Sequence, residues 1–225
     1  MTQSRRRVSS AVAVMVVISI AMAASVYVGA ANQTHFPMLF RVACVGDSIT
    51  QITSYPSDLQ TMLGPQTLLG NFGVSGSTVD LASPKPYMYQ KALQGAVQFQ
   101  PTTVIIMLGT NDARSDVYPS IAKFESDYKM LIQQFEDLRS KPRIFVVIPP
   151  PVFNNTLNIS TENLDTGVIP RIEQVANQTG LSLIDANTPL LQHPDDFVDG
   201  VHPNNDGAQV IANTIYQGII EAEES

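Results

Sequence analysis

The segment 102–108 constrains the fold more than any other part of the sequence. Two threonines are followed there by five consecutive apolar residues, and Gly109 ends the run. A continuous apolar run that is rich in β-branched residues is typical of a strand buried on both faces, as in a parallel sheet. Four further short apolar runs occur along the chain, at 40–45, 67–72, 143–148 and 181–184. The sequence therefore predicts five buried strands.

Segments with helical spacing separate these runs. The clearest is 121–138, where apolar residues recur every three or four positions and charged residues occupy the other side. Further helices are expected at 55–63, 85–99 and 165–178, and a last one that begins at Asn204 or Asn205. Strands that alternate with helices form βαβ units, whose strands run parallel. We expect an α/β domain of three α/β/α layers around a five-stranded, mostly parallel sheet.

The N-terminus differs from the rest of the chain. Three arginines at 5–7 precede an uncharged, mostly apolar run at 8–31. This pattern predicts an export signal, either a cleaved signal peptide or an uncleaved anchor that spans the membrane. We expect 1–31 to be this signal, 32–38 a short linker and 39–222 the folded domain. In both cases the domain lies outside the cytoplasm, secreted or membrane-anchored.

The charge of the exported part restricts its partners. Without residues 1–31 the chain has 10 basic and 20 acidic residues, a net charge of −10. So acidic a body is not expected to bind nucleic acid. Cys44 is the only cysteine, which excludes an intrachain disulfide. In a eukaryotic secretory pathway, four Asn-x-Ser/Thr sites would accept glycans. They are Asn32, Asn154, Asn158 and Asn177.

Polar residues follow each of the first three predicted strands. Ser48 comes after the first strand, Gly76 after the second and Asn111 after the third. Because the carboxyl ends of parallel strands meet at one edge of a sheet, we expect these residues to lie close together. Each of them taken alone is ordinary turn chemistry. Their combination at one edge is what a catalytic site requires.

A histidine and an aspartate lie in the loop before the last helix. Asp199 precedes His202 by three residues, so its carboxylate can accept the Nδ1 proton and leave Nε2 free to face a hydroxyl. Ser48 can supply that hydroxyl, and backbone N–H groups of Ser48 and Gly76 with the amide of Asn111 can bind an oxyanion. His193, beside two aspartates, is the competing candidate for the base.

Four segments together resemble the SGNH (GDSL-type) hydrolases. They are Gly46-Asp47-Ser48-Ile49-Thr50, Asn71-Phe72-Gly73-Val74-Ser75-Gly76, Gly109-Thr110-Asn111-Asp112 and Asp199-Gly200-Val201-His202-Pro203. The resemblance implies a flavodoxin-like fold without metal or organic cofactor. It also implies Ser48 as nucleophile, Asp199 and His202 as its partners, and Gly76 and Asn111 as oxyanion donors.

The sequence departs from the family soon after the serine. Family members often carry a glycine there, whereas this chain continues Gln51-Ile52-Thr53. We expect the substrate pocket to be lined by Asp47, Asp112, Gln51 and Val201. The segment 149–153 is a further candidate for an acyl pocket.

The resemblance to small carbohydrate-esterase and sialate-O-acetylesterase-like members predicts a substrate. We expect an exported serine esterase that removes short acyl groups, above all acetyl, from a small ester or a glycan. Several alternatives use the same fold. They are an acyltransferase, a lysophospholipase, a thioesterase and a non-catalytic carbohydrate-binding domain.

Overall fold

The computed structural model describes residues 40–224, and all structural statements below concern this part of the chain. Its centre is a sheet of five strands in the order β2-β1-β3-β4-β5, and every neighbouring pair is parallel. The strands are β1 Phe40–Gly46, β2 Thr67–Gly73, β3 Thr103–Met107, β4 Arg143–Ile148 and β5 Ser182–Asp185. The predicted five-stranded sheet is confirmed, and it is fully parallel.

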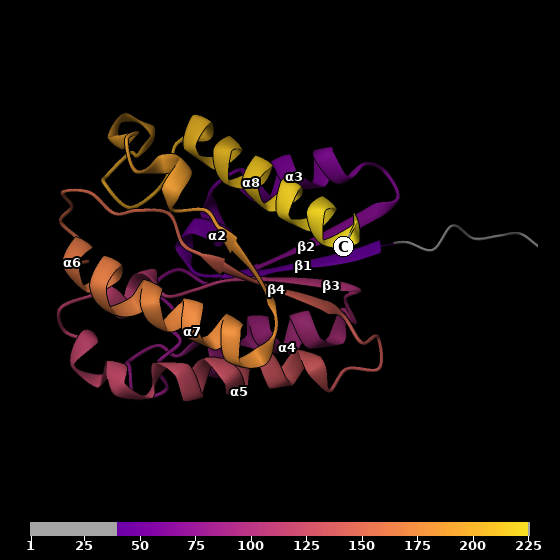
Figure 1. Ribbon diagram of the computed structural model, residues 1–225, viewed down its shortest axis with the longest axis horizontal. Coiled ribbons are helices and arrows are strands. Elements are labelled where there is room, and N and C mark those ends of the chain that lie inside the picture. Colours follow the sequence, from indigo (N-terminus) through magenta and orange to yellow (C-terminus); the bar gives the residue numbers. More distant parts are fainter. Residues whose placement is uncertain (1–39, 225) are drawn as a thin grey trace, which may run out of the picture. The chain divides into compact units, whose positions relative to one another are not determined.

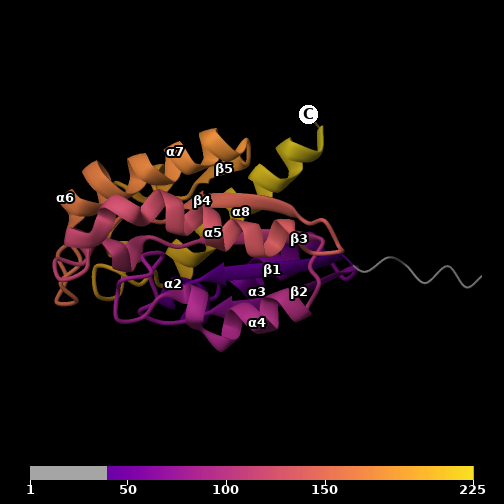
Figure 2. The same ribbon diagram turned by 90° about the horizontal axis from the view of Figure 1, so that it is seen from below.

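Helices cover both faces of this sheet (Figure 1). One face carries α4 Lys91–Gln98, α5 Phe124–Glu136 and α7 Ile169–Thr179, and the other carries α3 Tyr55–Leu63 and α8 Asn205–Glu224. The perpendicular view in Figure 2 shows α4, α5 and α7 along the near side of the strands. The three-layer α/β/α architecture predicted from the sequence is therefore confirmed.

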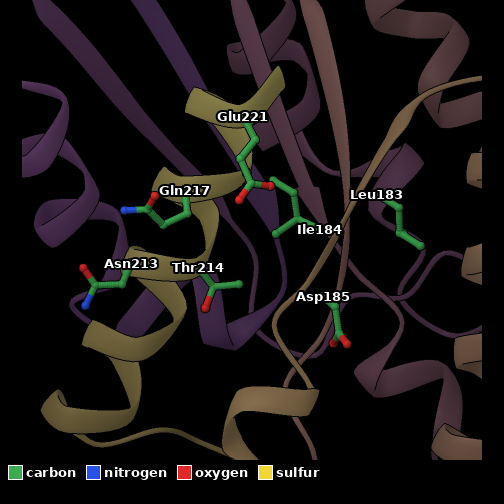
Figure 3. Close-up of a pocket in the computed structure, with 8 residues that line it drawn as sticks. Leu183, Ile184, Asp185, Asn213, Thr214, Gln217 and Glu221 are labelled. Atoms are coloured by element: carbon green, nitrogen blue, oxygen red, sulfur yellow. The ribbon is translucent and has the colours of Figure 1, made fainter. Parts of the chain in front are cut away.

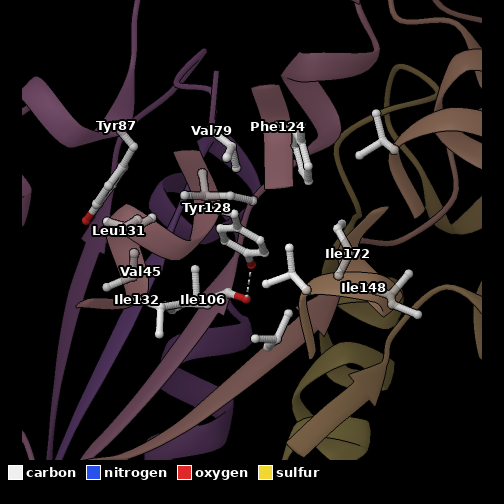
Figure 4. Packing of buried hydrophobic residues seen from close by; sticks show 14 of the residues in the cluster. Val45, Val79, Tyr87, Ile106, Phe124, Tyr128, Leu131, Ile132, Ile148 and Ile172 are labelled. Atoms are coloured by element: carbon white, nitrogen blue, oxygen red, sulfur yellow. Dashed lines mark hydrogen bonds between the residues drawn. The ribbon is translucent and has the colours of Figure 1, made fainter. Parts of the chain in front are cut away.

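The central strands are buried on both faces, as their continuous apolar sequence predicts. Alternate residues of β1 and β3 belong to two separate apolar clusters, one on each side of the sheet. Figure 4 shows one cluster, in which Val45 and Ile106 face Tyr128 and Leu131 of α5. The hydroxyl of Tyr128 donates a hydrogen bond of 3.2 Å to the carbonyl of Ile106, so this buried polar group is satisfied.

The helix expected at 85–99 begins later than its spacing suggested. Pro86 pairs with Thr78 as an isolated parallel bridge, and the N–H of Tyr87 donates to the carbonyl of Thr78 at 2.8 Å. These bonds keep the chain extended up to a 3-10 turn, η1 Tyr87–Tyr89, and α4 begins only at Lys91. Proline at 86 favours this outcome because it cannot donate inside a helix.

Several shorter turns precede or follow the main helices. The 3-10 turn η3 Tyr118–Lys123 forms the first part of the segment expected as one helix at 121–138. The first residues of the helix expected at 165–178 instead form a π turn, η4 Leu164–Val168, which follows α6 Thr161–Asn163, and α7 begins only at Ile169. The others are α2 Ser48–Ile52, η2 Thr110–Ala113, η5 Thr188–Leu190 and η6 Pro194–Asp196.

The strand order places a crevice at the carboxyl end of β1. The chain passes from β1 to β2 on one side and then crosses to β3 on the other side. Where the direction of winding reverses in this way, the connections on either side diverge and leave room for a ligand. Ser48 lies two residues after the end of β1, and the turns after β2 and β3 lie at the same edge.

Some predictions concern residues that the structure does not describe. The export signal at 1–31, the linker at 32–38 and the sequon at Asn32 all lie outside the described residues. The other three sequon asparagines are solvent-exposed. None of the helices between Phe40 and Glu224 combines the length and the apolar content that crossing a bilayer requires.

Candidate active site

Ser48 is the first residue of a single helical turn that the sequence did not reveal. The turn, α2, begins directly after β1, and the Asp47 side chain caps it by accepting a hydrogen bond of 2.9 Å from the N–H of Ile49. Aspartate is among the preferred N-cap residues because its carboxylate satisfies such an orphan N–H. The cap fixes the direction in which Ser48 leaves the strand.

The side chains of Ser48 and His202 meet, although 154 residues separate them in the chain. His202 Nε2 lies 2.9 Å from Ser48 Oγ, and His202 Nδ1 lies 2.7 Å from Asp199 Oδ2. Both distances lie within the range of normal hydrogen bonds. The three side chains predicted from the sequence thus form one hydrogen-bonded chain at the carboxyl edge of the sheet.

The loop that carries His202 is held by its own residues. Asp199 Oδ1 accepts the N–H groups of Val201 at 3.0 Å and of His202 at 2.8 Å. Gly200 has φ +80°, and a Cβ there would lie 2.3 Å from the carbonyl oxygen of Asn154. Only glycine meets both conditions without strain. The loop therefore positions the imidazole before any ligand binds.

The charge of Asp199 determines the tautomer of His202. Burial raises the pKa of Asp199, but the hydrogen bonds from the His202 ring and from the backbone N–H groups of His202 and Val201 outweigh burial. The pKa of Asp199 therefore lies below its ordinary value. An ionised carboxylate only accepts hydrogen bonds, so Nδ1 carries the proton and Nε2 presents its lone pair to Ser48. In this arrangement the hydroxyl of Ser48 is the donor to Nε2.

Two backbone N–H groups near Ser48 have no acceptor within the described part of the protein. They belong to Ser48 itself and to Gly76, which has φ +74°. Their neighbours do have acceptors, since the N–H of Ser75 donates to Gln51 Oε1 at 2.7 Å. Unpaired donors beside a nucleophilic hydroxyl can bind a developing oxyanion.

Asn111 lies at the same edge, but its amide already has partners. Its Nδ2 donates to Asp47 Oδ2 at 3.2 Å and to the carbonyl of Ser77 at 3.1 Å. Both N–H bonds of the amide therefore have acceptors in the protein. The side chain is 7% exposed and forms part of the cavity wall described next.

These groups surround a cavity of about 290 Å³. Its wall combines the reactive side chains with apolar ones and a single cation, Arg114, whose guanidinium forms a bidentate pair with Asp116. The residues that line it are Ser48, Ile52, Ser75, Gly76, Asn111, Arg114, Leu157, Ile159, Val201 and His202.

Comparison with models of protein families shows which family the chain belongs to. Residues 44–210, which include all four segments quoted above, match the model of the GDSL-like lipase/acylhydrolase family. The chain belongs to this family. This match confirms the family that the sequence predicts. At the level of the family, it also confirms an enzyme that hydrolyses esters.

Individual relatives agree with this assignment. An acetylxylan esterase of Xylanibacter ruminicola is 33% identical over 205 residues, which covers 80% of this chain but only 43% of the relative. The chain thus spans less than half the length of that protein. Two solved structures share the fold: an aryl esterase of M. smegmatis (TM-score 0.64, 18% identity, 81% and 99% of the two chains) and a carbohydrate acetylesterase of Sinorhizobium meliloti (0.65, 18%, 81% and 99%).

The structure corrects the predicted lining of the substrate pocket. Asp47 and Asp112 are 1% and 0% exposed, so they lie beneath the cavity and not on its wall. Gln51 bonds to Ser75 through its Oε1 and is likewise not part of the wall. Of the four residues expected, only Val201 lines the cavity.

Other residues form the wall instead. Leu157 and Ile159 come from the polar loop after β4, where no sequence pattern indicates a pocket. The segment 149–153 does not line it, since Phe153 packs against the ring of Phe197 at 4.9 Å. The bridge between Arg114 and Ile159 brings this loop to the site, and it links residues too distant in the chain to be paired from sequence.

The competing histidine lies at the surface beside a different acid. The side chain of His193 is 59% exposed, and its Nδ1 lies 3.6 Å from Asp196. It is not part of the cavity wall.

A larger hollow of about 380 Å³ lies between β5 and α8 (Figure 3). It is lined by Leu183, Asp185, Asn213 and Gln217 among others, and it contains neither a serine nor a histidine. Its residues lack the nucleophile and base that ester hydrolysis by serine requires.

Asp112 ties two of the site's loops together from below. Its carboxylate accepts the backbone N–H groups of Val79 and Asp80, at distances between 2.9 and 3.1 Å. Burial raises the pKa of Asp112 to about 7, and these hydrogen bonds only partly oppose burial. The loop after β2 is therefore hydrogen-bonded to a carboxyl group that takes up a proton near neutral pH.

We predict that Asp112→Asn makes stability less dependent on pH. Because the pKa of Asp112 is raised in the folded state, the folded protein keeps a proton that the unfolded chain releases. The free energy of unfolding should thus fall as pH rises from about 4 to about 7, by up to about 1.4 kcal/mol per pH unit for one group. Urea denaturation between pH 4.5 and 7.5 should give a shallower fall for the variant. The surface variant Asp137→Asn should keep the wild-type slope, and equal slopes for all three proteins would contradict the prediction.

Proposed function

We propose that the protein is an exported serine esterase that removes acetyl and other short acyl groups from carbohydrate. The observation that carries the proposal is the hydrogen-bonded chain from Ser48 through His202 to Asp199. Its order and polarity suit the removal of a proton from Ser48, because Nε2 accepts and Asp199 stabilises the resulting imidazolium. Family membership supports the same chemistry.

In the first half of the reaction, Ser48 Oγ attacks the carbonyl carbon of the ester while His202 Nε2 takes the Ser48 proton. The carbonyl oxygen becomes an oxyanion, which the N–H groups of Ser48 and Gly76 bind, together with an N–H of the Asn111 amide that is shared with its acceptor in the protein. His202 then gives its proton to the departing alcohol oxygen as the carbon–oxygen bond of the ester breaks. The acyl group remains on Ser48.

In the second half, water attacks the acyl carbon and His202 takes a proton from that water. The bond between the acyl carbon and Ser48 Oγ breaks, and His202 returns the proton to Ser48. One ester and one water have then become one carboxylic acid and one alcohol. Asp199 remains ionised throughout and holds Nδ1–H in place.

The size and lining of the cavity support a short acyl group. At about 290 Å³ it lies at the lower end of typical ligand cavities, and four aliphatic side chains border it. Polar groups of Ser75 and Arg114 share the wall and could bind sugar hydroxyls. The similarity to an acetylxylan esterase supports a carbohydrate as the alcohol part.

Export is the second part of the proposal. The arginines at 5–7 and the uncharged run at 8–31 support it, because export machinery recognises this charge and hydropathy pattern. The catalytic domain would then act outside the cytoplasm, secreted or membrane-anchored, where polymeric carbohydrate is accessible.

His202 and His193 provide a matched pair for testing the proton acceptor. Ser48→Ala and His202→Ala should each lower kcat for p-nitrophenyl acetate at least about 10³-fold, because the hydroxyl or its base is lost. His193→Ala removes an exposed imidazole and should change kcat less than about twofold. A comparable collapse in His193→Ala, or activity that survives Ser48→Ala, would contradict the assignment.

The substrate is tested with two ester series. Among p-nitrophenyl esters we expect kcat/KM to fall as the acyl chain lengthens from acetate to octanoate, because the cavity is small. Acetylated xylo-oligosaccharide should release acetate at a rate that depends on Ser48. A preference for octanoate, or for a lysophospholipid over the acetylated sugar, would favour the lipase-like alternative.

Export is tested by expressing the full chain and fractionating the cells. We expect the protein outside the cytoplasm, and its intact mass distinguishes removal of the N-terminal segment from its retention as an anchor. A full-length protein found only in the cytosolic fraction would contradict export.

A further inference from the structure

Asp47 is a buried carboxylate next to the nucleophile, and the proposed chemistry does not use it. It is 1% exposed and precedes Ser48 directly. A carboxylate that is buried without hydrogen bonds is costly, so its partners indicate its role. The two oxygens of Asp47 have different partners.

One oxygen accepts a hydrogen bond from the backbone, and the other accepts one from the Asn111 side chain. Oδ1 accepts the N–H of Ile49 at 2.9 Å and so caps α2. Oδ2 accepts a hydrogen bond of 3.2 Å from Asn111 Nδ2, which also donates to the Ser77 carbonyl at 3.1 Å. The carboxylate therefore connects the Ser48 turn with the turn after β3.

These contacts specify which end of the Asn111 amide is nitrogen. An asparagine side chain can present its oxygen or its nitrogen in nearly the same space, and the neighbouring groups decide between them. Here both neighbours of Nδ2 are acceptors. A flipped amide would place Oδ1 against a carboxylate and a carbonyl oxygen, which repels it.

We propose that Asp47 is a positioning residue, which holds the Asn111 amide with its N–H groups beside Ser48 and so keeps a donor where the oxyanion forms. The proposal rests on the proposed esterase function. Without Asp47, only the Ser77 carbonyl opposes a flip, and a flipped amide would present a partial negative charge to the oxyanion. The bonds of 3.1 and 3.2 Å are at the long end of the normal range, so an N–H can be shared with the oxyanion during the reaction.

The ionisation of Asp47 matters for this role because only the carboxylate is purely an acceptor. Burial raises the pKa of Asp47 to about 6, so the carboxylate is mainly ionised at neutral pH. Three titratable groups face it: His202, which lowers its pKa, Tyr55 from α3 and Asp112 from η2. Measurements at pH 8 keep Asp47 ionised.

The test is Asp47→Asn, which changes one atom of the contact. The new amide can still accept from Ile49 through its oxygen, and asparagine caps helices as well as aspartate. Its NH₂ group, however, would face the NH₂ group of Asn111. At pH 8 we expect kcat for p-nitrophenyl acetate to fall about 10- to 100-fold, with KM changed less than about threefold, because a transition-state donor is misplaced.

A double-mutant comparison separates this role from general damage. Asn111→Ala alone should lower kcat about 10²–10³-fold. In that background, Asp47→Asn should cost less than about threefold, since no amide remains to be positioned. An equal loss in both backgrounds would overturn the proposal, as would an Asp47→Asn protein with kcat within twofold of the wild type.

Two more variants distinguish positioning from mere stability. The exchange Asp47→Asn with Asn111→Asp restores the hydrogen bond between positions 47 and 111 with reversed polarity, so the melting temperature should lie above that of Asn111→Asp alone while kcat stays low. A recovery of kcat would overturn the proposal. The matched control Asp127→Asn alters another buried carboxylate, one that accepts the N–H of Leu81 at 3.0 Å, and should leave kcat within about twofold.

A second variant tests the proposal if Asp47→Asn does not fold. Asp47→Ser keeps a capping oxygen and removes the acceptor for Asn111, so it should show the same loss of kcat. Failure of both variants to fold would overturn the proposal, because Asp47 would then serve stability.

Failure of the esterase function itself gives a different result. The wild type would then hydrolyse no ester tested, and hydrogen exchange of the Asn111 NH₂ group, measured by NMR, would decide the role of Asp47. Protection in the wild type that is lost in Asp47→Asn supports positioning, and equal exchange in the two proteins contradicts it.

Discussion

The contact between His202 Nε2 and Ser48 Oγ is the interaction on which the site depends. It joins a loop before the last helix to the turn after the first strand, across 154 residues. No local structure can hold two side chains that far apart in sequence at 2.9 Å. The parallel sheet does so, because it ends β1 at the edge where the loop before α8 also lies. The other hydrogen bonds of the site hold the loops that carry these two side chains.

Two kinds of buried polar group support the contact. Asp199 lies in the loop itself and sets the tautomer of His202 through hydrogen bonds within three residues. Asp47 and Asp112 lie below the cavity and fasten the turns after β1, β2 and β3 to one another. Burial raises the pKa of both of these carboxyl groups, to about 6 and about 7. The loops of the site are therefore held by buried carboxyl groups. Burying these groups costs free energy, and their hydrogen bonds offset part of that cost.

The sequence predicted those features that local patterns determine. The five strands follow from apolar runs, and the pairing of Asp199 with His202 follows from a spacing of three residues in one loop. The pocket wall could not be predicted in this way, because Leu157 and Ile159 reach it through a bridge to Arg114. The sequence also places Asp47 in the pocket wall, whereas the structure buries it. Its buried carboxylate is hydrogen-bonded to Asn111, a partner from another strand end that no sequence pattern links to it.

The central claim is that His202 activates Ser48 for attack on a carbonyl carbon, and covalent trapping tests it most directly. We would treat the protein with a p-nitrophenyl phosphonate ester and measure its intact mass and its labelled peptide. The account predicts one phosphonyl group per molecule, attached to Ser48, with labelling at least about 10²-fold slower in His202→Ala. A label on another residue, or equal rates with and without His202, would contradict it.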